Sequence, residues 1–232
     1  MAKPAAYFTP ATFKFLRALA RNNSREWFAN HKADYEKYLR QPFLSLIADL
    51  VEPLAKISPH FVADPKPVGG SLFRIHRDTR FSGDKTPYKT WAGAKFFHTR
   101  HKELMGDTPV FYLHVEPGEC FVGGGLWHAQ PEAVRRVRDY MVNNPASWKA
   151  ATRSAAFKRV YALTGEALSR PPRGYDPQHE LIDDLKRKDF VCGAQLDDAT
   201  MASPALLKTV VQHFQRAAPM NDWLCGALDL DF

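Results

Sequence analysis

The sequence predicts an α+β fold, with helices on either side of a central block of antiparallel or mixed strands. Two patterns lead to this prediction. In residues 10–54, 131–141 and 204–214, apolar residues recur every three or four positions, as on one face of a helix. In residues 72–77 and 110–116, apolar and polar residues alternate, as in a strand with one buried face. The sheet is therefore expected in the middle of the chain.

The N-terminal region predicts three helices. Thr9-Pro10 opens the first, because Thr is a common N-cap and Pro fits the first helical turn. Ser24 caps the second, which carries an aromatic stripe on one face: Trp27, His31, Tyr35 and Tyr38. Pro42 is expected to break this helix and start a third, which Pro53 should kink or end. Residues 58–70 hold three prolines and two glycines and predict a loop.

The central block predicts short strands joined by loops, at residues 72–77, 91–98, 110–116 and 120–122. Gly123-Gly124-Gly125 is expected to end the last strand and to permit a bulge or a close backbone approach. It lacks the Lys-Ser/Thr of a phosphate-binding loop and the spacing of a dinucleotide fingerprint. The glycines are thus interpreted as structural.

Four proline-marked starts predict the C-terminal helices: Pro131, Asn144-Pro145, Asp176-Pro177 and Ser203-Pro204. The third of these helices is expected to span residues 179–188, and residues 190–196 read as one more strand. No internal repeat or low-complexity linker interrupts the chain. We therefore expect one domain over residues 1–232.

The amino-acid composition indicates the cellular compartment and the kind of partner. Lys and Arg number 32 against 25 Asp and Glu, a net charge of +7 that favours anionic partners without requiring them. Three widely spaced cysteines are typical of a reducing compartment, and no apolar run reaches the ~20 residues of a membrane span. The first residues are too short and broken for a signal peptide. We expect a cytoplasmic protein without membrane contact; the sequence indicates no cofactor, metal or oligomeric state.

The most charged segment is residues 73–90, called the basic loop below. It holds five cationic side chains against two acidic ones: Arg74, Arg77, Arg80, Lys85 and Lys89 against Asp78 and Asp84. If residues 72–78 form a strand, Arg74, His76 and Asp78 share one face and can bind an anion. Arg donates two parallel hydrogen bonds to phosphate or carboxylate, and Tyr88 adds a ring and a hydroxyl. The other interpretation is structural, with Arg74 and Arg80 pairing with these acids to pin the loop.

Two further groups of residues are candidates. Arg173 and Tyr175 follow a stiff Pro-Pro pair and are expected to be displayed before the Asp176-Pro177 helix. His114 and Glu116 share a strand face with Tyr112 and could act as metal ligands or as an acid–base pair. No third ligand follows at a recognisable spacing, so a solvated or hydrogen-bonded sheet face is the preferred interpretation.

Residues 77–90, RDTRFSGDKTPYKT, resemble the signature of a widespread, mostly bacterial family classed as a conserved domain of unknown function. Further similarity occurs in the same order along nearly the whole chain, at residues 22–32, 123–127, 172–176 and 186–190. The resemblance implies an intact single-domain member of that family. It implies no activity, but it suggests that the matching loops lie together in space.

Three functional hypotheses follow. In the first, the protein binds or acts on a phosphate- or carboxylate-bearing small molecule, with His76–Asp78 or His114–Glu116 as the base of a catalytic version. The second is association with nucleic acid, in which aromatic residues among the cations stack on bases: Phe81, Tyr88 and Trp91. No helix-turn-helix, RNA-recognition or zinc-finger pattern supports the second. In the third, the basic loop is structural and the protein acts through partner contacts.

Overall fold

The computed structural model describes residues 6–80 and 82–232 and confirms the α+β fold class. A six-stranded sheet runs through its centre in the order β1-β2-β3-β4-β6-β5, and every neighbouring pair is antiparallel. The strands are β1 (Phe61–Val62), β2 (Ala92–His98), β3 (Val110–Val115), β4 (Phe121–Leu126), β5 (Ala162–Thr164) and β6 (Phe190–Gln195).

Helices precede and follow this sheet, as expected. Before it come α1 (Pro10–Arg21), α2 (Arg25–Asn30), α3 (Lys32–Tyr35), the π-helical turn η1 (Glu36–Arg40) and α4 (Gln41–Ile57). Among and after the later strands come α5 (Pro131–Asn143), α6 (Pro145–Arg153), α7 (Ala155–Lys158), α8 (Ile182–Leu185), α9 (Asp198–Met201) and α10 (Leu206–Ala227). In the part of the chain that the structure describes, no helix has both the length and the apolarity to cross a bilayer.

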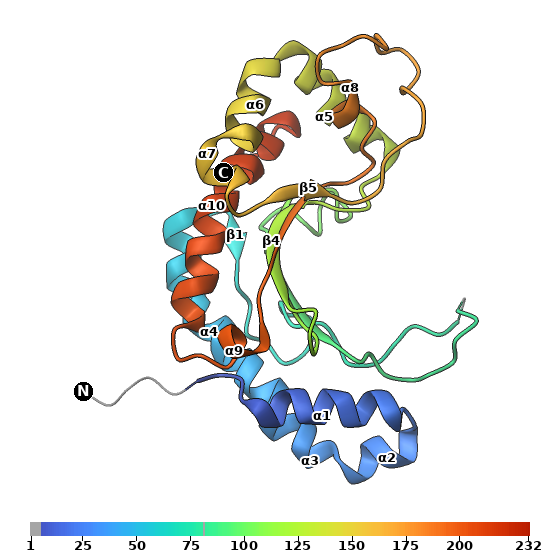
Figure 1. The fold of residues 1–232 in the computed structure, drawn as a ribbon, viewed down its shortest axis with the longest axis vertical. Coiled ribbons are helices and arrows are strands. Elements are labelled where there is room, and N and C mark those ends of the chain that lie inside the picture. Colours follow the sequence, from blue (N-terminus) through green and yellow to red (C-terminus); the bar gives the residue numbers. More distant parts are fainter. Residues whose placement is uncertain (1–5, 81) are drawn as a thin grey trace.

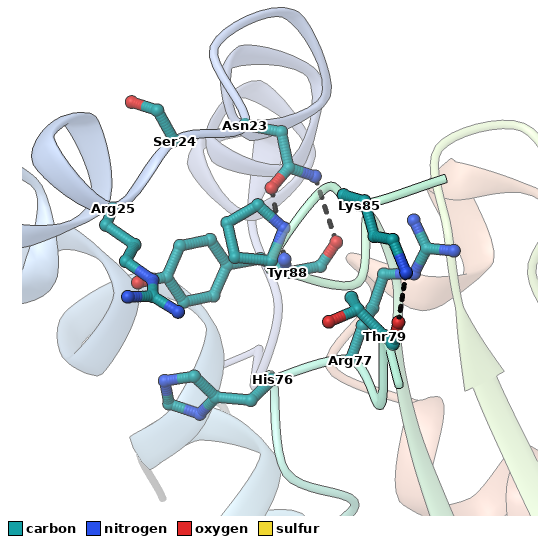
Figure 2. Close-up of a pocket in the computed structure, with 9 residues that line it drawn as sticks. Asn23, Ser24, Arg25, His76, Arg77, Thr79, Lys85 and Tyr88 are labelled. Carbon is teal, nitrogen blue, oxygen red and sulfur yellow. Dashed lines mark hydrogen bonds between the residues drawn. The ribbon is translucent and has the colours of Figure 1, made fainter. Parts of the chain in front are cut away.

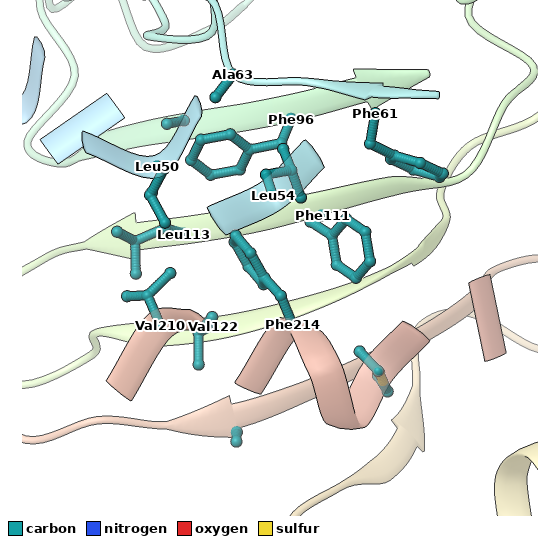
Figure 3. Close-up of a cluster of buried hydrophobic side chains, with 14 of the residues drawn as sticks. Leu50, Leu54, Phe61, Ala63, Phe96, Phe111, Leu113, Val122, Val210 and Phe214 are labelled. Atoms are coloured by element: carbon teal, nitrogen blue, oxygen red, sulfur yellow. The ribbon is translucent and has the colours of Figure 1, made fainter. Parts of the chain in front are cut away.

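The hydrophobic core lies between one face of the sheet and the helices α4 and α10 (Figures 1 and 3). Phe214 of α10 packs its ring 4.8 Å from that of Phe111 and 5.2 Å from that of Phe96, centroid to centroid. The opposite face of the sheet is flanked by the basic loop at one end and by the loop near residues 165–180 at the other (Figure 1). Both candidate loops therefore lie on the side away from α4 and α10.

The helix starts in the N-terminal region are confirmed, including that of α4 at Gln41-Pro42, but the break expected before Pro42 and the helix end expected at Pro53 are wrong. Thr9 and Ser24 are N-caps, and the Ser24 side chain accepts a hydrogen bond from the Trp27 N–H. Pro42 does not break the helical path. The Gln41 N–H bonds five residues back to the Glu36 carbonyl, and this wide turn accommodates the proline ring while Gln41 keeps helical angles of φ −63° and ψ −45°. Likewise α4 continues past Pro53.

The predicted strand at residues 72–77 is replaced by a loop that pairs with itself. Only isolated bridges form, between Leu72 and Ala94 and between His76 and Tyr88. The backbone of the basic loop folds back, with the Arg77 N–H donating to the Pro87 carbonyl and the Lys89 N–H to the Ile75 carbonyl. Side-chain exposure still alternates along this segment: Ile75 is buried, and Arg74, His76 and Asp78 are exposed.

Three other expectations need correction. The glycine run lies inside β4 rather than ending it, and it does permit close approach, since a Cβ on Gly125 (φ +127°) would lie 2.1 Å from the Phe190 carbonyl oxygen. Asp176-Pro177 does not open a long helix; turns at His179 and Ile182, bonded three residues back, lead only to the four-residue α8. The strand β1 lies within the predicted loop, and the three-residue β5 was not predicted.

Candidate functional site

A cavity of about 720 Å³ opens between the start of α2 and the basic loop (Figure 2). Its lining comprises Asn23, Ser24, Arg25, His76, Arg77, Thr79, Lys85, Pro87 and Tyr88. Two guanidinium groups, one ammonium group and one imidazole are among these side chains, and no carboxylate is, as far as the described residues show. We call this cavity the basic cavity. Its lining favours a negatively charged occupant.

Asn23 joins the two segments that form the basic cavity. Its side-chain amide donates to the Tyr88 carbonyl at 2.9 Å and accepts from the Tyr88 N–H at 3.1 Å. The Tyr88 ring stacks on Phe28 of α2, with centroids 4.1 Å apart and planes 19° apart, and is 6% exposed. The basic loop is therefore held against α2 by both backbone and ring contacts, which fixes one wall of the cavity.

Two basic side chains that line the basic cavity make no hydrogen bond or ion pair within the described chain. Among the described residues, Arg25 has no hydrogen-bond or ion-pair partner. His76 makes ring contacts with Phe28 and Tyr88, at centroid distances of 6.4 and 5.2 Å, but no hydrogen bond within the described chain. Both side chains are exposed and lie on the same side of Tyr88 (Figure 2). They can therefore donate hydrogen bonds to a ligand.

Other cations of the basic loop are already engaged. Arg77 pairs with Asp84 and Thr86, and the Lys85 ammonium donates to the Thr79 carbonyl at 3.0 Å. Arg80 makes two hydrogen bonds to Asp78, at 2.7 and 3.0 Å. These pairs agree with the structural interpretation of the loop.

The same contacts change the acidity of the two carboxyl groups. The side-chain bond from Arg80 lowers the pKa of Asp78 to about 2. The Thr86 backbone N–H, followed by the Arg77 and Thr86 side chains, lowers the pKa of Asp84 to about 2. Both groups therefore stay ionised at any neutral pH and keep neutralising part of the basic loop.

Lys89 lies beside a second, smaller cavity of about 420 Å³, which shares Arg77 and Tyr88 with the first. Its ammonium donates to the Arg74 carbonyl at 2.9 Å and lies 4.9 Å from the centre of the Trp91 ring. Burial, and then the charge of Arg74, lower the pKa of Lys89. The exposed Arg74 guanidinium lines neither of the two cavities.

The structure does not bring the second predicted loop to the basic cavity. Tyr175 packs on α5, where its hydroxyl donates to Asp139 at 2.7 Å, and burial followed by Asp139 raises its pKa to about 12. The exposed Arg173 lies in the same loop, at the other end of the molecule from the basic loop (Figure 1). Phe81 lies outside the described residues.

Residues 11–223 match a family model described as conserved hypothetical protein, DUF2461. The chain belongs to this family. Comparisons with curated proteins and with solved structures found no match. The family assignment agrees with the resemblance found in the sequence, and two of the segments that carried it, 22–32 and 77–90, meet in space through Asn23 and Tyr88.

In this DUF2461 chain the face of β3 that lies away from the core carries a chain of hydrogen bonds. The Tyr112 hydroxyl lies 3.0 Å from His114 Nδ1, and His114 Nε2 lies 3.0 Å from Glu116 Oε2. Burial, followed by the charge of Glu116, raises the pKa of Tyr112. The preferred sequence interpretation, a hydrogen-bonded sheet face, matches this arrangement. Across the described ranges, no group of three or more His, Cys, Asp or Glu could hold a metal ion.

Sequence reasoning missed Asn23 and Arg25 as cavity residues. The available signal is the resemblance of residues 22–32 to a conserved family, because both residues lie in that segment. Neither residue type has a spacing rule that connects it to a loop 65 positions away, the separation of Asn23 from Tyr88. Arg25 also lies in the first turn of a short helix, where a cation gains nothing from the helix dipole.

Proposed function

We propose that this protein binds a small molecule bearing phosphate or carboxylate groups in the basic cavity. The observation that carries the proposal is the pair Arg25 and His76, whose donors face one cavity and have no hydrogen-bond partner in the described chain. Arg77 and Lys85 line the same cavity and add positive charge. The cavity volume of about 720 Å³ falls in the range of small-molecule sites, ~300–1,000 Å³.

In this proposal the two kinds of cation have different roles. Arg25 offers a planar fork that can make two parallel bonds to one phosphate or carboxylate group. Arg77 is partly neutralised by its ion pair with Asp84. It therefore adds positive electrostatic potential to the cavity but is not the main hydrogen-bond donor to the ligand. Asn23 sets the distance between the two walls through its bonds to Tyr88.

The test is a thermal-shift and calorimetric screen with inorganic phosphate, pyrophosphate and citrate. A ligand that binds only the folded state at 100 times its Kd stabilises the protein by about 2.7 kcal/mol. Replacing Arg25 by Ala should weaken binding at least ~10-fold, since a charge-assisted hydrogen bond contributes ~1.5–3 kcal/mol. Arg173→Ala is the matched control, because Arg173 is also exposed and unpaired within the described chain.

Two results would reject the proposal. If none of the three anions shifts the melting temperature, the basic cavity is not an anion site of this class. If Arg173→Ala weakens binding as much as Arg25→Ala, the effect comes from net charge and not from the cavity. In that case the structural interpretation of the basic loop remains, with function in partner contacts.

The nucleic-acid hypothesis has less support. Stacking needs exposed rings, but Tyr88 is buried against Phe28. Trp91 already has the Lys89 ammonium 4.9 Å from its ring centre and the His114 ring at 4.9 Å. Binding of a single-stranded oligonucleotide, with an affinity that falls steeply with salt, would favour this alternative over the small-molecule proposal.

We also propose a cytoplasmic location. The three cysteines, Cys120, Cys192 and Cys225, are all free and buried. Burial raises the pKa of each thiol, to about 11 for Cys120 and about 12 for the other two. Unpaired thiols are typical of proteins in a reducing compartment. Fractionation of the native host cells would test the location directly.

A further inference from the structure

A separate cavity of about 430 Å³ lies beside β2 and shares no lining residue with the basic cavity. Its walls come from β2, from the segment between β2 and β3, and from the segment after β4. The lining residues are Lys95, His101, Lys102, Met105, Gly106, Asp107, Trp127, His128 and Gln130. We call it the Lys95 cavity. Nothing in the proposed anion binding makes use of it.

Lys95 has an unusual set of neighbours for a lysine. Its Nζ lies 2.8 Å from His101 Nε2, and His101 Nδ1 lies 2.6 Å from the Thr108 hydroxyl oxygen. Within the described residues, Lys95 forms no ion pair with a carboxylate. The acid among the described lining residues, Asp107, accepts a hydrogen bond from the Gln130 N–H at 2.9 Å. The Lys95 ammonium charge is thus poorly compensated.

The surroundings lower the pKa of both bases. Burial lowers the pKa of Lys95. Burial, and then the positive charge of Lys95, lower the pKa of His101 to about 4. A neutral His101 accepts at Nε2 from Lys95 and donates from Nδ1–H to Thr108, which matches both observed distances. The remaining titratable neighbours are Tyr112, which is the cross-strand partner of Lys95, His98, whose charge also lowers the pKa of His101, and Lys102 and His128 in the lining.

The rim of the Lys95 cavity has two further features of a ligand site. Met105 (φ 51°) and His128 (φ 52°) are two of the three non-glycine residues with positive φ in the described chain. Such strained conformations concentrate at binding and catalytic sites. Met105 is 87% exposed and Trp127 is 62% exposed, so apolar side chains face solvent beside the amine.

From this arrangement we infer that Lys95 is a nucleophilic amine that forms an imine with a small aldehyde or ketone in the cavity. The Nζ lone pair attacks the carbonyl carbon, and the C–N bond forms as the C–O π bond opens to a carbinolamine. The two amine protons leave with the carbonyl oxygen as water, so the step needs no further reactant. His101 is a positioning residue: by accepting one N–H it directs the Nζ lone pair elsewhere.

The first test uses the wild-type protein. It is incubated at pH 7 with glyoxylate and sodium cyanoborohydride, which reduces an imine to a stable secondary amine, and each lysine is followed by peptide mass spectrometry at low conversion. Lys102 is the internal control, because it lines the same cavity and is exposed. We expect Lys95 to be labelled clearly faster than Lys102, since the neutral amine is the nucleophile and burial lowers the pKa of Lys95.

Saturation separates a site from a merely reactive amine. The Lys95 rate should reach a plateau as the glyoxylate concentration rises. Labelling of Lys95 at the rate of Lys102, or a rate that stays proportional to glyoxylate, overturns the inference. Neither result depends on any variant folding correctly, and neither bears on the anion screen.

The role of His101 is tested by His101→Leu, which keeps a side chain of similar size but removes the acceptor. We expect slower labelling of Lys95, with the rate at Lys102 unchanged. An unchanged Lys95 rate would show that His101 only fills space. Lys95→Arg, which keeps the charge and removes the nucleophile, should abolish the fast-labelled lysine peptide.

Discussion

Asn23 binds both backbone groups of Tyr88, a residue 65 positions further along the chain. Its amide thereby takes the place that a neighbouring strand would occupy, donating to the carbonyl at 2.9 Å and accepting from the N–H at 3.1 Å. Because Asn23 immediately precedes the N-cap of α2, the contact positions the start of that helix against the basic loop. The basic cavity exists because these two segments are joined at this point.

Asn23→Ala should therefore destabilise the protein and weaken anion binding together. The substitution leaves the Tyr88 N–H and carbonyl without their partner, which costs about 1–3 kcal/mol. Urea unfolding measures the loss. The matched control is Asn22→Ala, because the neighbouring amide makes one local hydrogen bond to Ala18. If both variants lose equally little stability, the Asn23 contact does not hold the cavity together.

Acidification should weaken the basic loop at a defined pH. The folded-state pKa values of Asp78 and Asp84 are about 2, below the ordinary value of about 3.9. A depressed carboxyl pKa contributes stability that is present above pH ~4 and is lost as the pH falls through ~2. The stability difference between wild type and Asp84→Asn should therefore shrink as the pH is lowered from 5 to 2. A constant difference over this range would show that the charge of Asp84 contributes nothing.

The sequence predicts the fold class and most strands because those depend on local periodicity. The alternation at β3 and the caps at Thr9 and Ser24 are examples. The same rule fails for the basic loop. Residues 72 and 73 make isolated contacts with β2 and residues 75–77 pair with residues 87–89, so no strand of the sheet forms. Such pairing depends on which segments of the chain come together in the fold. The local pattern of apolar and polar residues does not specify this.

The candidate site divides in the same way. The sequence identifies the charged side chains of the basic loop, because charge is visible in residue types. It does not show which cations form ion pairs within the protein, since this depends on the position of Asp84 relative to Arg77 after the loop has folded. Nor does it place Arg173 and Tyr175, which depend on the packing of their loop against α5. The contribution of Arg25 is visible only once Asn23 has joined its segment to Tyr88.

The buried carboxylate of Asp184 should be important for stability in the C-terminal half. It accepts from Trp148 Nε1 and from Arg153 Nη2, each at 2.9 Å, and the Trp148 side chain is fully buried. Asp184→Ala leaves the indole N–H without an acceptor, and we expect a loss of about 3 kcal/mol in urea unfolding. The control Asp183→Ala, one residue away, removes an exposed ion pair with Lys186 and should cost at most ~1 kcal/mol. Equal losses would contradict this account.

His101 should remain uncharged well below neutral pH. Its folded-state pKa of about 4 lies below the ordinary 6.5, so its contribution to stability is present above pH ~6.5 and is lost as the pH falls through ~4. The C–H resonances of its ring in an NMR titration report this pKa directly. A midpoint near 6.5 would mean that the ring is solvated and that the Lys95 cavity is more polar than its contacts indicate.

The Lys95 charge is the second cause of this shift, after burial, and it can be removed separately. Lys95→Met keeps the length and the apolar stem of the side chain but deletes the ammonium group 2.8 Å from Nε2. The His101 pKa should then rise part of the way toward 6.5, because burial and the charge of His98 still lower it. If it stays at about 4, the two bases are not coupled, and His101 has no means of influencing the protonation of Lys95.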